Sequence, residues 1–124
     1  MDIKPIKNKE DYIEFYPWIK ECNFTEVTSD QVLANCLNGV YFGYVGFDKE
    51  KLVGMAICKD YGDMVFLVGT WCKGNLYKFE KQFFIVMKTK GFKTLRGSVR
   101  AGRKFPENIE GLKPLWTVYE KELK

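Results

Sequence analysis

The 124-residue sequence predicts a single mixed α+β domain, and three features of its hydrophobic pattern support this prediction. Two apolar segments are joined by the charged turn 48–51, which is typical of a β-hairpin. A third apolar segment, 64–68, follows the turn 60–63 and extends the hairpin into an antiparallel meander. Apolar residues then recur at intervals of three and four from Leu76 to Met87, which predicts a helix. Strands followed by a helical crossover are typical of a layered α/β domain.

The hairpin at 39–58 is the centre of the predicted sheet. Its first arm is rich in aromatic residues from Tyr41 to Phe47, and its second arm is aliphatic from Leu52 to Ile57. Both arms carry large apolar side chains at consecutive positions. Strands of this composition are covered on both faces, so we expect layers on either side of the sheet.

The residues before the hairpin predict a short strand and two helices. A first strand covers 1–6, and Asn8 caps a helix that Pro17 breaks or kinks. The segment Thr28-Ser29-Asp30-Gln31 has the form of a capping box and begins a second helix. Asn38-Gly39 supplies the left-handed residue that ends this helix.

The residues after the hairpin and meander complete the order of elements. The helix that begins at Leu76 ends at Gly91, and a strand from Lys93 to Val99 follows. An irregular basic segment leads to a closing strand, 115–119. The predicted fold is a single α/β (α+β) domain covering 1–124, in the order β-α-α-β-β-β-α-β-loop-β, with a mixed sheet and a central antiparallel meander.

The composition excludes several functional classes. The N-terminus has no apolar signal region, and no run approaches the roughly 20 apolar residues of a membrane span, so we expect a soluble, cytoplasmic protein that does not bind membranes. Four widely spaced cysteines form no CxxC pair, and the sequence contains no histidine. The commonest zinc ligand pairs are therefore missing, and we expect free thiols and no metal site.

Basic residues dominate one segment of a chain whose net charge is only +4. Between Lys88 and Lys104 there are seven basic residues and no acidic residue. This asymmetry indicates an anionic partner, such as a phosphate group, a nucleic acid or an acidic protein face. A solvated basic surface explains the pattern equally well.

Several short motifs, in order, resemble the GNAT family of acyl-CoA-dependent N-acyltransferases over nearly the whole chain. Ile3-Lys4-Pro5 before an acidic first helix is similar to the start of many such proteins. The segment 49–56, KEKLVGMA, resembles their hairpin, and the segment 87–93, MKTKGFK, lies where their long helix passes into the next strand. The segment 116–123 resembles their last strand.

The resemblance implies a site for acetyl-CoA. In that family a glycine-rich loop before the long helix points backbone amides at the pyrophosphate. The equivalent loop here, 69–75, departs from the family pattern because Trp71 is large and the leading Arg or Gln and a second small residue are missing. The phosphate-binding residues that the resemblance implies are Gly69, Lys73, Gly74 and Asn75.

The resemblance also directs attention to the residues that would carry out the chemistry. The usual general acid of the family is a tyrosine after the fifth strand, and the segment 101–109 contains none. Asp60 and Asp63 are the acids that precede the fourth strand, and they are the candidate catalytic residues. Aspartate is also an ordinary turn residue.

Three functional hypotheses remain open. The first is a GNAT-like domain with a degraded acyl-CoA site and a non-catalytic, protein-binding role with a virion or host protein, because the chain is similar to degenerate bacteriophage members of this fold. The second is an active, small acetyl-CoA-dependent N-acyltransferase, in which the backbone of 64–68 holds the pantetheine. The third is nucleic-acid binding through 88–104. The candidate binding surface consists of Trp71, Arg96, Arg100, Arg103 and Lys104.

Overall fold

The computed structural model describes residues 1–24, 27–74, 76–98, 112–115 and 118–123. The helices are α1 (Lys9–Glu14), α2 (Tyr16–Ile19), α3 (Ser29–Leu37) and α4 (Leu76–Thr89). The strands are β1 (Asp2–Pro5), β2 (Phe42–Asp48), β3 (Lys51–Asp60), β4 (Met64–Cys72), β5 (Thr94–Ser98), β6 (Leu112–Leu115) and β7 (Val118–Glu122).

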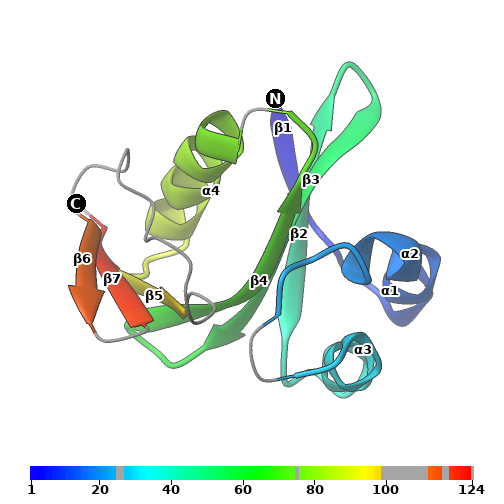
Figure 1. Cartoon of the computed structure of the whole chain (residues 1–124), viewed down its shortest axis with the longest axis horizontal. Coiled ribbons are helices and arrows are strands. Elements are labelled where there is room, and N and C mark those ends of the chain that lie inside the picture. Colours follow the sequence, from blue (N-terminus) through cyan, green and yellow to red (C-terminus); the bar gives the residue numbers. More distant parts are fainter. Residues whose placement is uncertain (25–26, 75, 99–111, 116–117, 124) are drawn as a thin grey trace.

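In the described part of the chain, seven strands form one mixed sheet in the order β1-β2-β3-β4-β5-β7-β6. Neighbouring strands are antiparallel except β4 and β5, which are parallel and are connected by α4. The sheet separates α4 on one face from α1, α2 and α3 on the other (Figure 1). The predicted mixed α+β fold with a central antiparallel meander is confirmed.

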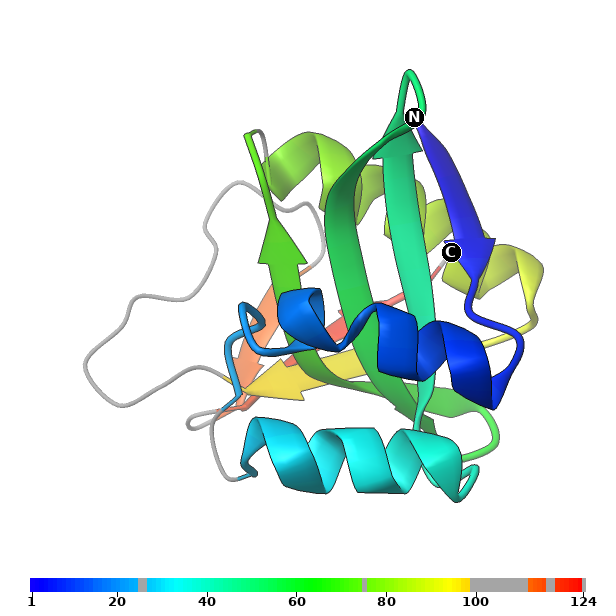
Figure 2. The same cartoon turned by 90° about the vertical axis from the view of Figure 1, so that its right-hand side faces the viewer.

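Each face of the sheet has its own hydrophobic core. Tyr44, Ala56 and Leu67 face α4 and pack with its aromatic side chains. Val45 and Met55 face the opposite way, toward the helices that lie in front of the sheet in Figure 2. Adjacent residues of the hairpin therefore contribute to different cores, as the alternation of side chains along a strand requires.

Local capping determines where the first helices begin and end. The Asn8 side chain accepts a 2.9 Å hydrogen bond from the Asp11 backbone N–H at the start of α1. Phe15 separates α1 from α2, with Pro17 in the first turn of α2 where its missing N–H is tolerated. Thr28 and Gln31 form the predicted capping box of α3 through reciprocal side-chain to backbone hydrogen bonds.

The C-terminal region differs in detail from the prediction. The predicted closing strand, 115–119, is replaced by two antiparallel strands, β6 and β7, and β7 pairs with β5. Pro114 lies in β6, an outer strand of the sheet, where its missing N–H interrupts no interior ladder. None of the described helices is long and apolar enough to cross a membrane.

Candidate functional site

The parallel strands β4 and β5 separate near the middle of β4. They pair from Met64 with Thr94 to Leu67 with Gly97, and β4 continues to Cys72 beside β3. The pairing of β3 with β4 shifts register at this point, which leaves Val68 as the extra residue of a β-bulge. A bulge bends the strand that contains it. The bulge therefore directs β4 away from β5 immediately after Leu67, and we call this point the divergence of β4 and β5.

A segment from the α2–α3 connection lies along β4 beyond the divergence. Asn23 donates its backbone N–H to the carbonyl oxygen of Thr70 over 3.0 Å and forms an isolated antiparallel bridge. Thr70 already pairs with Ala56 of β3 on its other side. A strand has only two edges, so Asn23 occupies the edge of β4 that faces β5. Leu67 is the last residue of β4 that pairs with β5, and Thr70 is the residue that Asn23 bridges. Val68 and Gly69 lie between them.

Gly69 allows this close approach. A Cβ atom at Gly69 would lie 2.4 Å from Cδ1 of Phe24 and 2.7 Å from the Asn23 carbonyl oxygen. Both Gly69 and the Phe24 side chain are buried. The predicted phosphate-binding residue Gly69 therefore lies within β4, with its α-carbon packed against a phenyl ring.

The other predicted phosphate-binding residues lie in the turn between β4 and α4. The Lys73 backbone N–H donates a 2.8 Å hydrogen bond to the Val53 carbonyl oxygen, and the Lys73 side chain is exposed. Gly74 has a φ of +94°, a left-handed conformation that favours glycine. Asn75 lies outside the described residues. The exposed turn thus places Lys73 and Gly74 next to the N-terminus of α4, whose first N–H groups have no partner within the helix.

The two candidate catalytic aspartates lie at the opposite end of β4. An oxygen of the Asp60 carboxylate accepts a 2.7 Å hydrogen bond from the Gly62 backbone N–H, as is usual for aspartate in a turn. The Asp63 carboxylate is exposed and lies 3.8 Å from the Lys93 ammonium. At about 3.3 Å per residue, Asp63 and Lys73 are separated by roughly 30 Å along the strand. The structure therefore does not bring the aspartates together with the Lys73–Gly74 turn.

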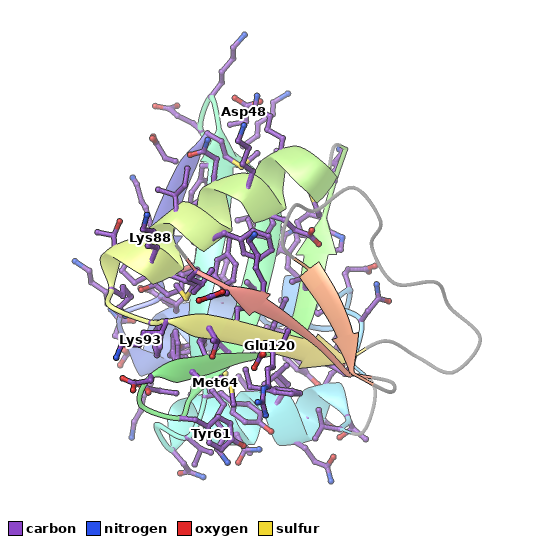
Figure 3. All side chains as sticks on the ribbon, turned by 90° about the vertical axis from the view of Figure 1, so that its left-hand side faces the viewer. Asp48, Tyr61, Met64, Lys88, Lys93 and Glu120 are labelled. Atoms are coloured by element: carbon purple, nitrogen blue, oxygen red, sulfur yellow. The ribbon has the colours of Figure 1, made fainter. Side chains whose placement is uncertain are left out.

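The candidate binding surface is only partly described. Trp71 is half-buried and packs against the core on the α1–α3 face. Arg96 on β5 donates a 2.8 Å hydrogen bond from Nε to the Glu120 carboxylate on β7, at the centre of the face in Figure 3. Arg100, Arg103 and Lys104 lie outside the described residues. In the described part of the basic segment, Lys93 and Arg96 each lie beside a carboxylate.

Glu80 is a candidate that the sequence reasoning missed. It lies on the inner face of α4 beside Phe79, Phe83 and Phe84, and it is 7% exposed. Burial raises the pKa of Glu80 to about 7. Burial and, to a smaller extent, the negative charge of Glu80 also raise the pKa of Cys72 at the end of β4. The sequence does contain one indication of this site, because Glu80 is a glutamate at a position where the helical period requires an apolar residue.

Comparison with known proteins identifies the fold. No protein-family profile matches the sequence, and no curated protein matches it. Among solved structures, GCN5 from Tetrahymena is similar with a TM-score of 0.71 and 10% identity, covering 100% of this chain and 97% of that one. The ribosomal-protein-S18-alanine N-acetyltransferase from Escherichia coli has a TM-score of 0.67 and 13% identity, and the match covers 98% of this chain and 93% of that one.

A third similar structure contains a bound cofactor. The PaiA N-acetyltransferase from Thermoplasma acidophilum, solved in complex with coenzyme A, has a TM-score of 0.61 and 14% identity, and the match covers 98% of this chain and 99% of that one. These similarities establish that the chain has the GNAT fold, which the order of sequence motifs predicted. At these identities they establish the fold alone.

Proposed function

We propose that this protein uses the GNAT fold as a scaffold for binding a protein partner, in a virion or a host cell, and does not transfer acyl groups. The observation that supports the proposal most directly is the bridge between Asn23 and Thr70 beside the divergence of β4 and β5. The resemblance to acyl-CoA-dependent enzymes implies that a pantetheine arm would need this edge of β4.

Part of the backbone of β4 on that edge is already used in hydrogen bonds within the protein. Of the segment 64–68, which is predicted to hold the pantetheine, Met64 to Leu67 are paired with β5. The Thr70 carbonyl oxygen accepts from Asn23. Between these two contacts lie Val68 and Gly69, and the Phe24 ring lies against Gly69. A bound pantetheine would have to displace native backbone contacts, which costs free energy that the remaining contacts would have to offset.

The distribution of acids and aromatic residues also supports a binding role. Asp60, the last residue of β3, and Asp63, just before β4, are exposed and lie at the opposite end of β4 from the Lys73–Gly74 turn. On the α1–α3 face, Trp18, Tyr41 and Trp71 are half-buried and packed against the core below them. Rigid, partly exposed aromatic side chains are effective anchors for a protein partner.

Titration with acetyl-CoA tests the proposal. The melting temperature of the protein is measured with increasing acetyl-CoA, and an active GNAT enzyme serves as the positive control. A ligand present at about 100 times its Kd stabilises a protein by about 2.7 kcal/mol, so a micromolar binder at millimolar concentration is readily detected. We expect no shift. A saturable increase at micromolar acetyl-CoA would refute the proposal.

An acetyl-CoA-dependent N-acyltransferase is the second candidate, and Glu80 is the observation that favours it. A buried carboxyl group with a pKa of about 7 is suited to proton transfer near neutral pH. The test measures thiol release from acetyl-CoA with a panel of amines. Amine-dependent release that falls in Glu80→Gln and in Lys73→Glu would support this candidate, and no release above the rate without protein would exclude it for those amines.

A further inference from the structure

We propose that copies of this chain associate head to tail, with one side of α4 in one copy lying against one side of α1 in the next copy. The side of α4 is basic, the side of α1 is acidic, and each carries an exposed isoleucine. A second copy of the same chain is therefore a partner that matches both surfaces. The contact does not depend on whether the protein binds acyl-CoA.

The first surface, which we call the α4 face, consists of Lys81, Ile85 and Lys88. These residues follow one another at intervals of four and three, so they lie on one side of the helix, and all three are exposed. Ile85 lies between the two lysines and is 52% exposed. The only acidic residue in the sequence of α4 is Glu80, which is buried. The solvent side of the helix therefore carries positive charge before and after an apolar residue.

The second surface, the α1 face, consists of Glu10, Ile13 and Glu14. Ile13 and Glu14 follow Glu10 by three and four positions, so the three residues share one side of α1, and all are exposed. Ile13 is 57% exposed, while Tyr12, the residue before it, is buried and attaches the helix to the core. α1 as a whole carries three acidic residues and one lysine. The α1 face thus resembles the α4 face with the opposite charge.

The charges of the two faces are not neutralised by ion pairs within the described part of the chain. The ion pairs formed there are Lys93 with Asp63 and Arg96 with Glu120, and neither pair includes a residue of the α4 face or the α1 face. Surfaces of opposite charge attract each other and determine the orientation in which two proteins meet. Two α4 faces, or two α1 faces, repel each other. The favoured contact is therefore one α4 face against one α1 face.

The positions of the two faces require that this contact join different molecules. α4 lies on one side of the sheet and α1 lies on the other (Figure 1), and Figure 3 views α4 from its own side of the sheet, with Lys88 labelled. Two copies joined by an α4 face and an α1 face leave one face of each kind unused. Such a contact is heterologous and adds further copies until a ring closes or a filament forms. We therefore expect a series of oligomers whose size rises with protein concentration.

The small size of the faces makes this association weak. α1 has six residues and is about 9 Å long, so a contact centred on it is small compared with the roughly 1,200 Å² of total surface that a stable, specific interface buries. Salt screens exposed charges, with a Debye length of about 10 Å at 0.1 M and about 3 Å at 1 M. The net charge of +4 adds a general repulsion between copies. Association is therefore expected at high protein concentration and low ionic strength.

Sedimentation velocity of the full chain at up to about 0.5 mM protein tests the proposal. Wild type is compared with two charge-reversed variants, Lys81→Glu/Lys88→Glu and Glu10→Lys/Glu14→Lys. We expect wild-type oligomers at about 20 mM salt that dissociate at about 500 mM, and monomers for each variant alone at both salt concentrations. An equimolar mixture of the two variants should associate again at low salt, because the reversed α4 face of one matches the reversed α1 face of the other.

The net charge of the variants separates this contact from general repulsion. Lys81→Glu/Lys88→Glu has a net charge of zero, because each substitution lowers the wild-type value of +4 by two. If net charge governed association, this variant would associate more strongly than wild type. Lys49→Glu/Lys51→Glu is the matched control, with the same net charge and both changes at the exposed end of the β2–β3 hairpin. The control should keep the association, and an equal loss in both variants would contradict the proposal.

Further results complete the test. Ile85→Ser keeps every charge and is expected to weaken association about threefold or more, because it removes apolar contact area. If a charge-reversed variant does not fold, the neutral Lys81→Gln/Lys88→Gln replaces it and must also lose the association. A wild type that stays monomeric at low salt would overturn the proposal. If that monomer binds a fluorescent single-stranded oligonucleotide through Lys81 and Lys88, the partner of the α4 face is a nucleic acid and the proposal is wrong.

Discussion

The Phe24 ring packs against the α-carbon of Gly69, and a Cβ at that position would lie 2.4 Å from two atoms of the ring. This contact joins the α2–α3 connection to β4 beside the divergence of β4 and β5. It explains why a glycine is present in a buried strand, where it otherwise weakens packing.

Replacing Gly69 by alanine is expected to destabilise the protein by about 1–3 kcal/mol, because the added methyl group overlaps both the Phe24 ring and the Asn23 backbone. Urea unfolding measures the change. The matched control is the double variant Phe24→Ala/Gly69→Ala. If the clash with Phe24 is the cause, the alanine at position 69 costs less free energy in the Phe24→Ala background than in the wild type, and an equal cost in both would contradict it.

Replacing Tyr12 by phenylalanine is expected to destabilise the protein by about 1–3 kcal/mol. The buried Tyr12 hydroxyl accepts a 2.8 Å hydrogen bond from the Gly43 backbone N–H, and the substitution leaves that donor without its partner. Burial raises the pKa of Tyr12 to about 12, so the hydroxyl remains neutral over the pH range of such an experiment. Tyr61→Phe, at an exposed site, is the control, and urea unfolding should show little change for it.

Lys90 is expected to stabilise the protein through two aromatic rings. Its ammonium lies 5.1 Å from the centre of the Phe42 ring and 5.2 Å from that of Tyr44. Lys90→Met keeps an apolar chain of similar length and removes the charge, so we expect a loss of about 1 kcal/mol in urea unfolding. Lys88→Met on the same end of α4 is the control. Similar losses for both variants would show that the rings contribute nothing specific.

The stability of the protein is expected to fall as the pH rises from about 4.5 to about 7. Burial raises the pKa of Glu80 from 4.5 to about 7, so the folded state binds more protons than the unfolded state within this window. The loss is on the order of 3 kcal/mol, since one unit of pKa shift corresponds to about 1.4 kcal/mol.

Urea unfolding at several pH values measures this effect by comparing wild type with Glu80→Gln. We expect the difference in unfolding free energy between the two proteins to change across the window, because glutamine does not ionise. Glu14→Gln, at an exposed position of α1, should keep the wild-type pH dependence. A pH dependence that is the same in Glu80→Gln and in wild type would show that Glu80 does not titrate in the folded protein.

The sequence predicted correctly the caps, breaks and turns that are formed by residues close together in the chain. The capping box at Thr28, the break at Pro17 and the charged turn of the hairpin all involve residues a few positions apart, so their geometry can be inferred from order alone. The sequence predicts one C-terminal strand where the structure has β6 and β7, because the composition does not show where one strand ends and the next begins.

The candidate site was harder to predict, for a physical reason. Asp60 and Asp63 were chosen because they are acids that precede β4, yet a strand is long, and its two ends are far apart. The apolar positions of α4 predict the helix without indicating Glu80, because hydrophobic period alone does not distinguish a buried glutamate from an exposed one. The positions of Lys73 and Gly74 before α4 were inferred correctly from the order of elements.

By itself, the sequence determined the order of the strands and main helices as far as β5, the two-sided burial of the hairpin and the resemblance to the GNAT fold, since hydrophobic period and capping are local properties. Only the tertiary structure decided that Asn23 bridges Thr70 and that Glu80 is buried beside Cys72. Contacts between segments far apart in the chain depend on how the layers pack, and the bend at Val68 separates β4 from β5 so that Asn23 reaches this edge of β4.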